Sequence, residues 1–365
     1  MDKRKLHLQA NRIETVLIKH RAPARITGGR VTPRLIQFNL QVDPAVKVSS
    51  VQALSEEIAM AVGARSARVT RSQGLLSIQI PRSDPVDVRF LPLARRLAND
   101  SQLNRAMQIP GTALLGLDTD GIPLLVRLAS PDVTHILIAG TTGSGKTEVM
   151  RTLLASLIYF QRPREIQLVL IDPKGSAFRM FEGLPHLLFS PIKTVQEALE
   201  RLRWLTAEME RRQQQGTARP RLVLVLDELA DLLQQGGGEM QAYLTRLAQR
   251  GRSAGISLVA CTQKPSASSV GSLTRANFPV RLVGRVTSAD EARIAAGLAA
   301  SGAEKLAGHG DFVLVAAGEL VRFQAAHLPA GEYEEFRAHL ALNAGRNARA
   351  SRDRSLISRL RRQGG

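Results

Sequence analysis

The spacing of apolar residues between positions 34 and 90 predicts a small mixed domain. The segment RLIQFNLQV, residues 34–42, places apolar residues at alternate positions from Ile36 to Val42, which is the period of a half-buried strand. Apolar residues at three- and four-residue spacing from Val51 to Val62 then predict a helix that ends at Gly63. Two short strands, at 67–71 and 75–80, follow. Residues 34–90 therefore predict a β-α-β-β domain.

From residue 133 onward, short apolar runs alternate with amphipathic segments, which is typical of a parallel sheet covered by helices. Strands are predicted at 134–139, 166–172, 221–227, 256–262, 279–286, 311–316 and 319–326. Helices are predicted at 146–160, 194–214, 239–250, 288–299 and 303–307. The helix at 194–214 carries an apolar stripe that is too short for a coiled coil, so we expect it to pack on the sheet. The fold class is therefore α/β.

Composition excludes several classes of protein. A chain of 365 residues with 44% hydrophobic residues is neither collagen-like, nor a mini-protein, nor wholly disordered. No apolar run approaches the ~20 residues that cross a bilayer, and the N-terminal MDKRKLHLQANR lacks the apolar centre of a signal peptide. The single cysteine, Cys261, can form neither an internal disulfide nor a zinc site. These features predict a cytoplasmic protein with no membrane segment in this chain.

The charge of the chain is strongly positive, with Lys+Arg 50 against Asp+Glu 32 and a formal net charge of +18. Residues 1–34 hold nine basic and two acidic residues, and residues 337–365 hold eight arginines and one aspartate. We interpret both ends as basic arms that contact a polyanion, with solvated tails as the alternative. Apolar residues between 356 and 360 favour a short basic C-terminal helix that could hold DNA, an acidic partner or an anionic membrane surface, and a disordered tail is the alternative.

The most specific motif is a phosphate-binding loop between the strand at 134–139 and the helix at 146–160. It fits G-x-x-x-x-G-K-[ST] completely. Its glycines let consecutive N–H groups face a phosphate, and the following helix adds its positive N-terminus. Lys146 is expected to reach the β- and γ-phosphates, and the Thr147 hydroxyl to bind Mg²⁺. The predicted nucleotide-binding residues are Gly140, Thr141, Thr142, Gly143, Ser144, Gly145, Lys146 and Thr147.

Two acidic residues end the apolar strand at 221–227. Asp227 is predicted to bind the metal, usually through water, and Glu228 to polarise the attacking water as a base. Because Glu228 directly follows Asp227, hydrolysis is favoured over storage of a nucleotide. The strand at 256–262 ends in Gln263, whose position suits a sensor of the γ-phosphate; a turn residue is the alternative. The chain has no Asn-Lys-x-Asp guanine reader, which favours ATP over GTP.

An arginine from a neighbouring subunit commonly completes the site of a nucleotide-driven motor, since charge that develops in the transition state needs a mobile cation. Several arginines beyond the fifth strand or in the loop before it are candidates, and composition does not choose between them: Arg252, Arg281, Arg285 and Arg293.

Together these segments resemble the FtsK/SpoIIIE family of DNA-pumping ATPases. The similar segments occur in the family's order at 135–147, 170–174, 182–188, 203–204, 208–212, 226–233, 248–256, 262–266 and 303–311. The small domain is similar to the family's alpha domain, so the resemblance covers about residues 30–330.

The resemblance implies a RecA-like P-loop ATPase domain, a hexameric ring of identical chains and double-stranded DNA in the central pore. It favours Arg293 as the arginine supplied in trans, beside Lys146, Glu228 and Gln263 as the other catalytic residues. It places DNA contacts after the long helix and after Gln263, at Arg211, Arg212, Arg219, Lys264, Ser266 and Arg275. The expected regions are a basic N-terminal arm (1–33), the small domain (34–100), the motor domain (101–330) and a basic C-terminal helix or tail (331–365).

This sequence departs from the cell-division members of the family, because it lacks their membrane spans and their DNA-reading winged-helix domain. We therefore expect a stand-alone, ATP-driven translocase of plasmid, phage, integrative-element or chromosomal DNA. Two other functions stay open: an ATPase for protein secretion, and a scaffold that switches with nucleotide but does not pump.

Overall fold

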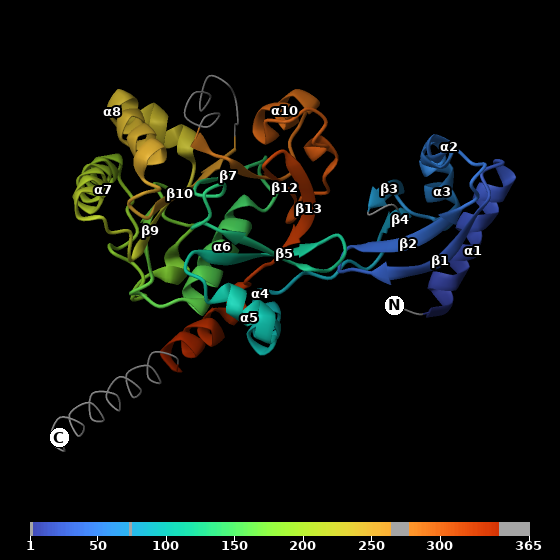
Figure 1. The fold of residues 1–365 in the computed structure, drawn as a ribbon, viewed down its shortest axis with the longest axis horizontal. Helices are drawn as coiled ribbons and strands as arrows, with labels where there is room; N and C mark the ends of the chain where they lie inside the picture. The colour runs from blue at the N-terminus through green and yellow to red at the C-terminus, as the bar shows by residue number, and fades with distance from the viewer. Residues whose placement is uncertain (1–2, 73–74, 264–276, 343–365) are drawn as a thin grey trace, which may run out of the picture. The chain divides into compact units, whose positions relative to one another are not determined.

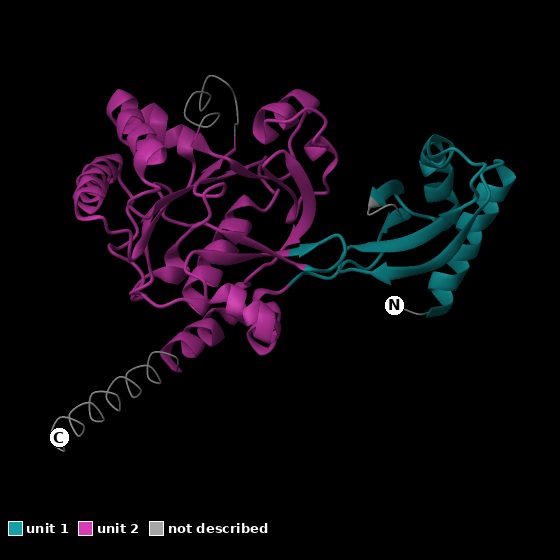
Figure 2. Ribbon diagram, viewed as in Figure 1, with its two compact units in different colours: residues 1–88, 117–122 teal, residues 89–116, 123–365 magenta. Residues whose placement is uncertain are grey.

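The computed structural model describes residues 3–72, 75–263 and 277–342. The chain divides into two compact units (Figure 2). Unit 1 comprises residues 1–88 and the hairpin tip 117–122, and unit 2 comprises residues 89–116 and 123–365. The boundary therefore lies near residue 88, before the expected boundary at residue 100.

Unit 1 is a four-stranded antiparallel sheet with three helices (Figure 1). The strands lie in the order β1-β2-β4-β3 and span Ala24–Val31 (β1), Leu35–Val42 (β2), Arg68–Ser72 (β3) and Leu75–Pro81 (β4). The helices are α1 (Lys3–Lys19), α2 (Val48–Ala53) and α3 (Ser55–Val62). Buried residues of all three helices, such as Leu17, Val51 and Ile58, form one apolar cluster with Phe38 and Ile78 of the sheet.

Residues 3–31 are part of this domain instead of the predicted basic arm. Ile13 and Leu17 are both 0% exposed, since they lie on the face of α1 that packs into the apolar cluster. Basic residues cover the opposite, solvated face of the same helix. An amphipathic helix buries its apolar stripe and leaves its charges in water, so a high count of basic residues is compatible with a packed element.

Unit 2 carries a nine-stranded sheet in the order β6-β5-β13-β12-β11-β7-β10-β9-β8. Its strands are β5 (Thr112–Asp118), β6 (Pro123–Arg127), β7 (Ile136–Ala139), β8 (Ile166–Ile171), β9 (Arg221–Leu226), β10 (Ile256–Thr262), β11 (Val280–Val283), β12 (Asp311–Ala316) and β13 (Glu319–Ala325). The five strands from β11 to β8 are parallel, as the apolar runs predicted. β12 pairs antiparallel with β11 and β13, so the whole sheet is mixed. The α/β fold class is confirmed.

Among the described residues, unit 2 has the labelled helices α4 (Phe90–Asn99), α5 (Ser101–Met107), α6 (Lys146–Phe160), α7 (Val195–Gln215), α8 (Leu229–Arg250) and α10 (Ala289–Ala296), beside a helical segment at 333–342. α7 and α8 bury their apolar residues against β8, β9 and β10, in agreement with the packing predicted for the helix at 194–214. α8 begins ten residues before the predicted start, and a kink at Gly237 (φ 58°) divides it. Among the described residues, none of the helices is both long and apolar enough to cross a membrane.

The first residues of the predicted C-terminal tail are folded. Residues 333–342 are helical, and Phe336 is 0% exposed. The Arg337 guanidinium donates to the carbonyls of Met180 (3.0 Å) and Glu182 (2.8 Å), which ties this helix to unit 2. The arginine-rich residues 345–362 lie outside the described residues.

Candidate nucleotide-binding site

The loop between β7 and α6 has the backbone of a phosphate cradle. Gly143 (φ 80°) and Gly145 (φ 101°) adopt left-handed conformations that favour glycine. A Cβ atom on Gly145 would lie 2.8 Å from the Gly310 backbone nitrogen, so no side chain fits at that position. The loop leads directly into the first turn of α6, whose free N–H groups and positive dipole end favour an anion.

Lys146 lies inside this cradle. Its residue is only 8% exposed, and its Nζ donates a hydrogen bond to the Thr141 carbonyl at 3.0 Å. Burial lowers the pKa of Lys146, although the nearby carboxylates of Glu228 and Asp227 act in the opposite direction. A desolvated ammonium group beside a glycine-rich loop at the N-terminus of a helix is suited to bind a phosphate.

Asp227 and Glu228 follow β9 at the same edge of the sheet. Burial, and after it the neighbouring Asp172 carboxylate, raise the pKa of Asp227 to about 6. Glu228 is 7% exposed and has a left-handed backbone (φ 63°, ψ 72°) at the start of α8. Its Oε1 accepts hydrogen bonds from the Gln263 backbone N–H (3.1 Å) and the Thr262 hydroxyl (3.4 Å). These two donors fix the direction in which the Glu228 carboxylate points.

Gln263 connects the two halves of the site. Its backbone N–H donates to Glu228, and its side-chain Oε1 accepts from the Thr142 hydroxyl at 3.2 Å. The residue after β10 therefore joins the phosphate loop after β7 to the carboxylate after β9. β10 lies between β7 and β9 in the sheet, so this arrangement follows from the strand order.

Asp172 was not predicted as a site residue, although it ends the neighbouring strand β8 in the same way that Asp227 ends β9. It is 1% exposed and accepts three backbone hydrogen bonds, from Lys174 (3.1 Å), Gly175 (2.9 Å) and Ala177 (2.7 Å). These bonds shape the loop that carries Lys174. Asp172 could have been predicted from the sequence, because it is an acidic residue that directly follows an apolar strand.

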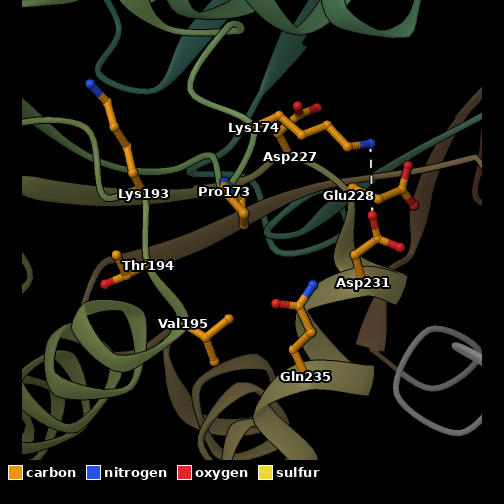
Figure 3. Close-up of a pocket in the computed structure, with 9 residues that line it drawn as sticks. All are labelled: Pro173, Lys174, Lys193, Thr194, Val195, Asp227, Glu228, Asp231 and Gln235. Carbon is orange, nitrogen blue, oxygen red and sulfur yellow. Dashed lines mark ion pairs between the residues drawn. The ribbon is translucent and has the colours of Figure 1, made fainter.

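A pocket of about 320 Å³ opens beside the acidic pair (Figure 3). In it, Lys174 Nζ points toward Asp231 Oδ2 on α8, at 3.7 Å. The pocket is lined by Pro173, Lys174, Lys193, Thr194, Val195, Asp227, Glu228, Asp231 and Gln235. Solvent therefore reaches Asp227 and Glu228 from this side.

Two segments far along the chain hold the phosphate loop from the side of β11. The Arg285 carbonyl accepts from the backbone N–H (2.8 Å) and the hydroxyl (3.0 Å) of Thr141. The backbone N–H groups of His309 and Gly310 donate to the carbonyls of Gly143 (3.1 Å) and Ser144 (2.9 Å). These bonds engage the Gly143 and Ser144 carbonyls and hold the loop in place.

The chain matches two sequence models. Residues 93–218 and 213–267 match the FtsK/SpoIIIE family, and residues 1–82 match the FtsK alpha domain. The chain belongs to the FtsK/SpoIIIE family. Its motor domain has the family's RecA-like P-loop ATPase fold, and the match to the alpha domain includes α1 and β1.

Curated relatives in this family are DNA translocases. The chain is 32% identical over 334 residues to the DNA translocase SftA of Bacillus subtilis (strain 168), which covers 84% of this chain and 34% of that protein. It is 31% identical to the DNA translocase FtsK of Caldanaerobacter subterraneus, over 89% of this chain and 48% of that protein. The chain thus spans between a third and a half of the length of these relatives.

Solved structures with a similar fold include other ATPases. The conjugation coupling protein TcpA of pCW3, solved with ATPγS, has a TM-score of 0.61 at 18% identity and covers 92% of this chain and 99% of its own. The cytoplasmic domain of the Thermomonospora curvata type VII secretion ATPase EccC has a TM-score of 0.53 at 28% identity, over 60% of this chain and 29% of its own.

Three of the arginines that were candidates for an arginine supplied in trans differ in their surroundings. Arg293 is exposed on α10 and pairs with Asp290 of the same helix at 3.7 Å. No contact within the described residues joins it to the phosphate loop. Arg281 is 9% exposed and donates to the carbonyls of Ile294 and Ala295 at 3.3 Å, so it supports the end of α10. Arg285 reaches the phosphate loop through its carbonyl, and its side chain is exposed.

Arg212 differs from its prediction as a DNA contact. It is 4% exposed, and it donates to the Glu208 carboxylate (2.7 Å) and to the carbonyls of Pro220 (2.6 Å) and Ala254 (3.2 Å). Its guanidinium is therefore a structural group that joins α7 to the starts of β9 and β10. Arg211 and Arg219 are exposed, and Arg211 pairs with Glu208 at 2.7 Å. Lys264, Ser266 and Arg275 lie outside the described residues.

We expect Arg212→Ala to destabilise the protein by about 3 kcal/mol, because it leaves the Ala254 and Pro220 carbonyls without this donor and removes the buried one of the two arginines that pair with Glu208. Chemical denaturation of the full chain measures this loss. Arg211→Ala is the matched control, since the exposed Arg211 is expected to change stability little. If the two variants unfold at the same denaturant concentration, the structural role of Arg212 is contradicted.

Proposed function

We propose that this chain hydrolyses ATP and uses the energy to move along double-stranded DNA as a ring of identical chains. The observation that carries the proposal is the link through Gln263. A change at the terminal phosphate would act on Thr142 and, through Gln263, on the position of Glu228. The names of the curated relatives support DNA as the polymer that is moved.

The residues of the site are suited to hydrolysis. Glu228 is held by two donors on one oxygen, so its carboxylate can orient a water molecule and accept its proton. Lys146 can neutralise charge on the β- and γ-phosphates, and the backbone N–H groups of the loop can hold the same oxygens. The Gln263 amide lies between these groups and can contact the γ-phosphate.

The site also fits a Mg²⁺ ion. Burial and repulsion from the nearby Asp172 carboxylate both raise the pKa of Asp227. A divalent cation would relieve that repulsion. Thr147, half-buried in the first turn of α6, would supply the second oxygen ligand. When bound, Mg²⁺ would supply positive charge that offsets the negative charge developing on the phosphates.

In a ring of identical chains, an arginine of one chain could complete the nucleotide site of the next chain. Arg293 is exposed and its only described ion pair is with the adjacent, also exposed, Asp290, so a second chain could engage it. We therefore keep Arg293 as the arginine that would reach the site of the next subunit. The variant Glu228→Gln is expected to bind ATP without hydrolysing it. The mass of its particle in ATP therefore tests whether the chains assemble into a ring.

Protein secretion is the second candidate function, because the EccC motor is 28% identical to this chain. That similarity covers 60% of the chain, whereas the DNA translocases match 84% and 89% of it. The larger coverage favours DNA.

We expect linear duplex DNA to raise the rate of phosphate release. DNA contacts made through the phosphate backbone release counterions, so the affinity for duplex should fall about 10³-fold between 50 and 200 mM salt. Phosphate release measured with and without duplex over this salt range tests the proposal, with a signal-sequence peptide as the competing polymer. A rate that responds to the peptide and ignores DNA would reverse the order of the two candidate functions.

A further inference from the structure

The four strands of unit 1 present a polar face opposite their apolar cluster. Strand residues alternate between the two faces of a sheet, and residues paired across an antiparallel ladder share a face. The apolar cluster takes Ile36, Phe38 and Leu40 of β2. The residues between them, Gln37, Asn39 and Gln41, therefore belong to the other face.

The pairing register extends this polar face into rows across all four strands. One row runs Arg30, Gln37, Gln79, Arg68 from β1 to β3. The next row runs Gly28, Asn39, Ser77, Thr70 in the same direction. Arg25 pairs with Gln41 in a third row. Arginines thus stand on both edge strands, and amide or hydroxyl groups lie between them.

The side chains of the middle row are shorter than those of the row that begins at Arg30. Gly28 has no side chain, and a Cβ atom placed on it would meet nothing within 4 Å. Asn39, Ser77 and Thr70 are all short, and the Ser77 and Thr70 hydroxyls hydrogen-bond to each other at 3.0 Å. Ser77 is 3% exposed, and Asn39 and Thr70 are half-buried. Close approach by an extended polymer is therefore possible mainly at β1, where Gly28 is exposed and has no side chain.

The charge of this face has one sign. The sequences of the four strands are ARITGGRV, LIQFNLQV, RVTRS and LLSIQIP, which contain no acidic residue. The register places Arg25, Arg30 and Arg68 on the polar face, whereas Arg71 pairs with Leu76 and belongs to the other face. Arg30 contacts Asp120 of the hairpin tip, and the described part of the chain shows no ion pair for Arg25 or Arg68. Both of these arginines are exposed. Uncompensated arginines beside amide donors are complementary to phosphate.

The same face offers no ring for a base to stack on. Phe38 is the one aromatic residue in the four strands, and it is 4% exposed in the apolar cluster. Single-stranded nucleic acid is usually held by exposed aromatic side chains, whereas a duplex presents only its backbone outside the grooves. We propose that the polar face of unit 1 binds the sugar-phosphate backbone of duplex DNA, as a contact separate from those of the motor domain.

This inference rests on the proposed action on duplex DNA, and its test uses the full chain. Arg25→Gln/Arg68→Gln removes both arginines without an ion pair from the polar face. Lys19→Gln/Lys47→Gln is the matched control, because it removes two exposed charges from α1 and from the residue before α2, away from these strands. Arg25→Lys/Arg68→Lys restores the charge. Thermal unfolding of all three variants shows whether each is folded.

The measurement is the affinity for a fluorescent duplex at several salt concentrations. Each lost phosphate contact lowers the slope of log K against log salt by about 0.9, so the Gln variant should lose about 1.8 per bound chain. The control should keep the wild-type slope, and the Lys variant should recover it. If the Gln variant and the control behave alike while the wild type binds DNA, the polar face is not a DNA contact. If the Gln variant changes particle mass and not the slope, the face is an interface between copies of this chain. If the wild type itself ignores DNA, the proposed function fails first.

Discussion

Glu228→Gln is expected to retain ATP and to lose turnover by about 10²- to 10⁴-fold, the usual contribution of a positioned general base. Gln has nearly the same shape as Glu, so its amide oxygen can still accept from Gln263 and Thr262, whose donors hold Glu228 at 3.1 and 3.4 Å. What is lost is the negative charge that would accept a proton from water. The measurement is phosphate release at saturating ATP beside a binding titration of the same variant.

The control for this prediction is Asp231→Asn. Asp231 lines the same pocket and pairs with Lys174, but its carboxylate is 47% exposed in the first turn of α8. We expect it to keep most of the turnover. Because Glu228→Gln should hold ATP, its particle mass in ATP also measures the proposed ring. A variant that turns over ATP normally would contradict the role of Glu228, and a single chain of 39.7 kDa would contradict the ring.

The nucleotide site could be predicted from the sequence because each of its parts is local. Gln263 follows β10 directly, Glu228 lies two residues after β9, and Lys146 begins α6 at the end of the loop after β7. Parallel strands bring their carboxyl ends to one edge of the sheet. The sequence did not predict what holds the loop from behind. His309 and Gly310 donate to carbonyls more than 160 residues earlier in the chain, and such long-range backbone contacts leave no periodic signal.

The charge pattern was less informative than the apolar pattern. Nine basic residues near the N-terminus suggested an arm, whereas Ile13 and Leu17 at helical spacing mark the packed helix that the structure contains. Arg212 shows the same limit on a smaller scale. It stands beside Arg211 in the sequence, but neighbours on a helix point about 100° apart, so one arginine is buried and the other is exposed.

The antiparallel direction of the strands at the end of the motor domain could not be predicted from the sequence. β12 and β13 have the apolar runs that predicted strands, but runs of this kind give no direction. Their antiparallel order matters for the site, because it brings the loop before β12 to the phosphate loop after β7. That loop is braced by Asp311, which receives two hydrogen bonds from Arg322 at 2.9 and 2.7 Å.

Lys146→Ala is expected to weaken ATP binding by about 10²- to 10³-fold, which corresponds to the loss of a buried, charge-assisted hydrogen bond to phosphate. Lys146 is 8% exposed, so in the variant water would solvate the phosphates less well at this buried position than it could at the surface. Titration with a fluorescent ATP analogue measures the change. Lys174→Ala is the matched control: its side chain is 52% exposed and pairs with Asp231 at 3.7 Å, so its removal should weaken binding by less than about threefold. Equal losses in the two variants would mean that the site attracts ATP through general positive charge, and the cradle would then have no special part in holding the phosphates.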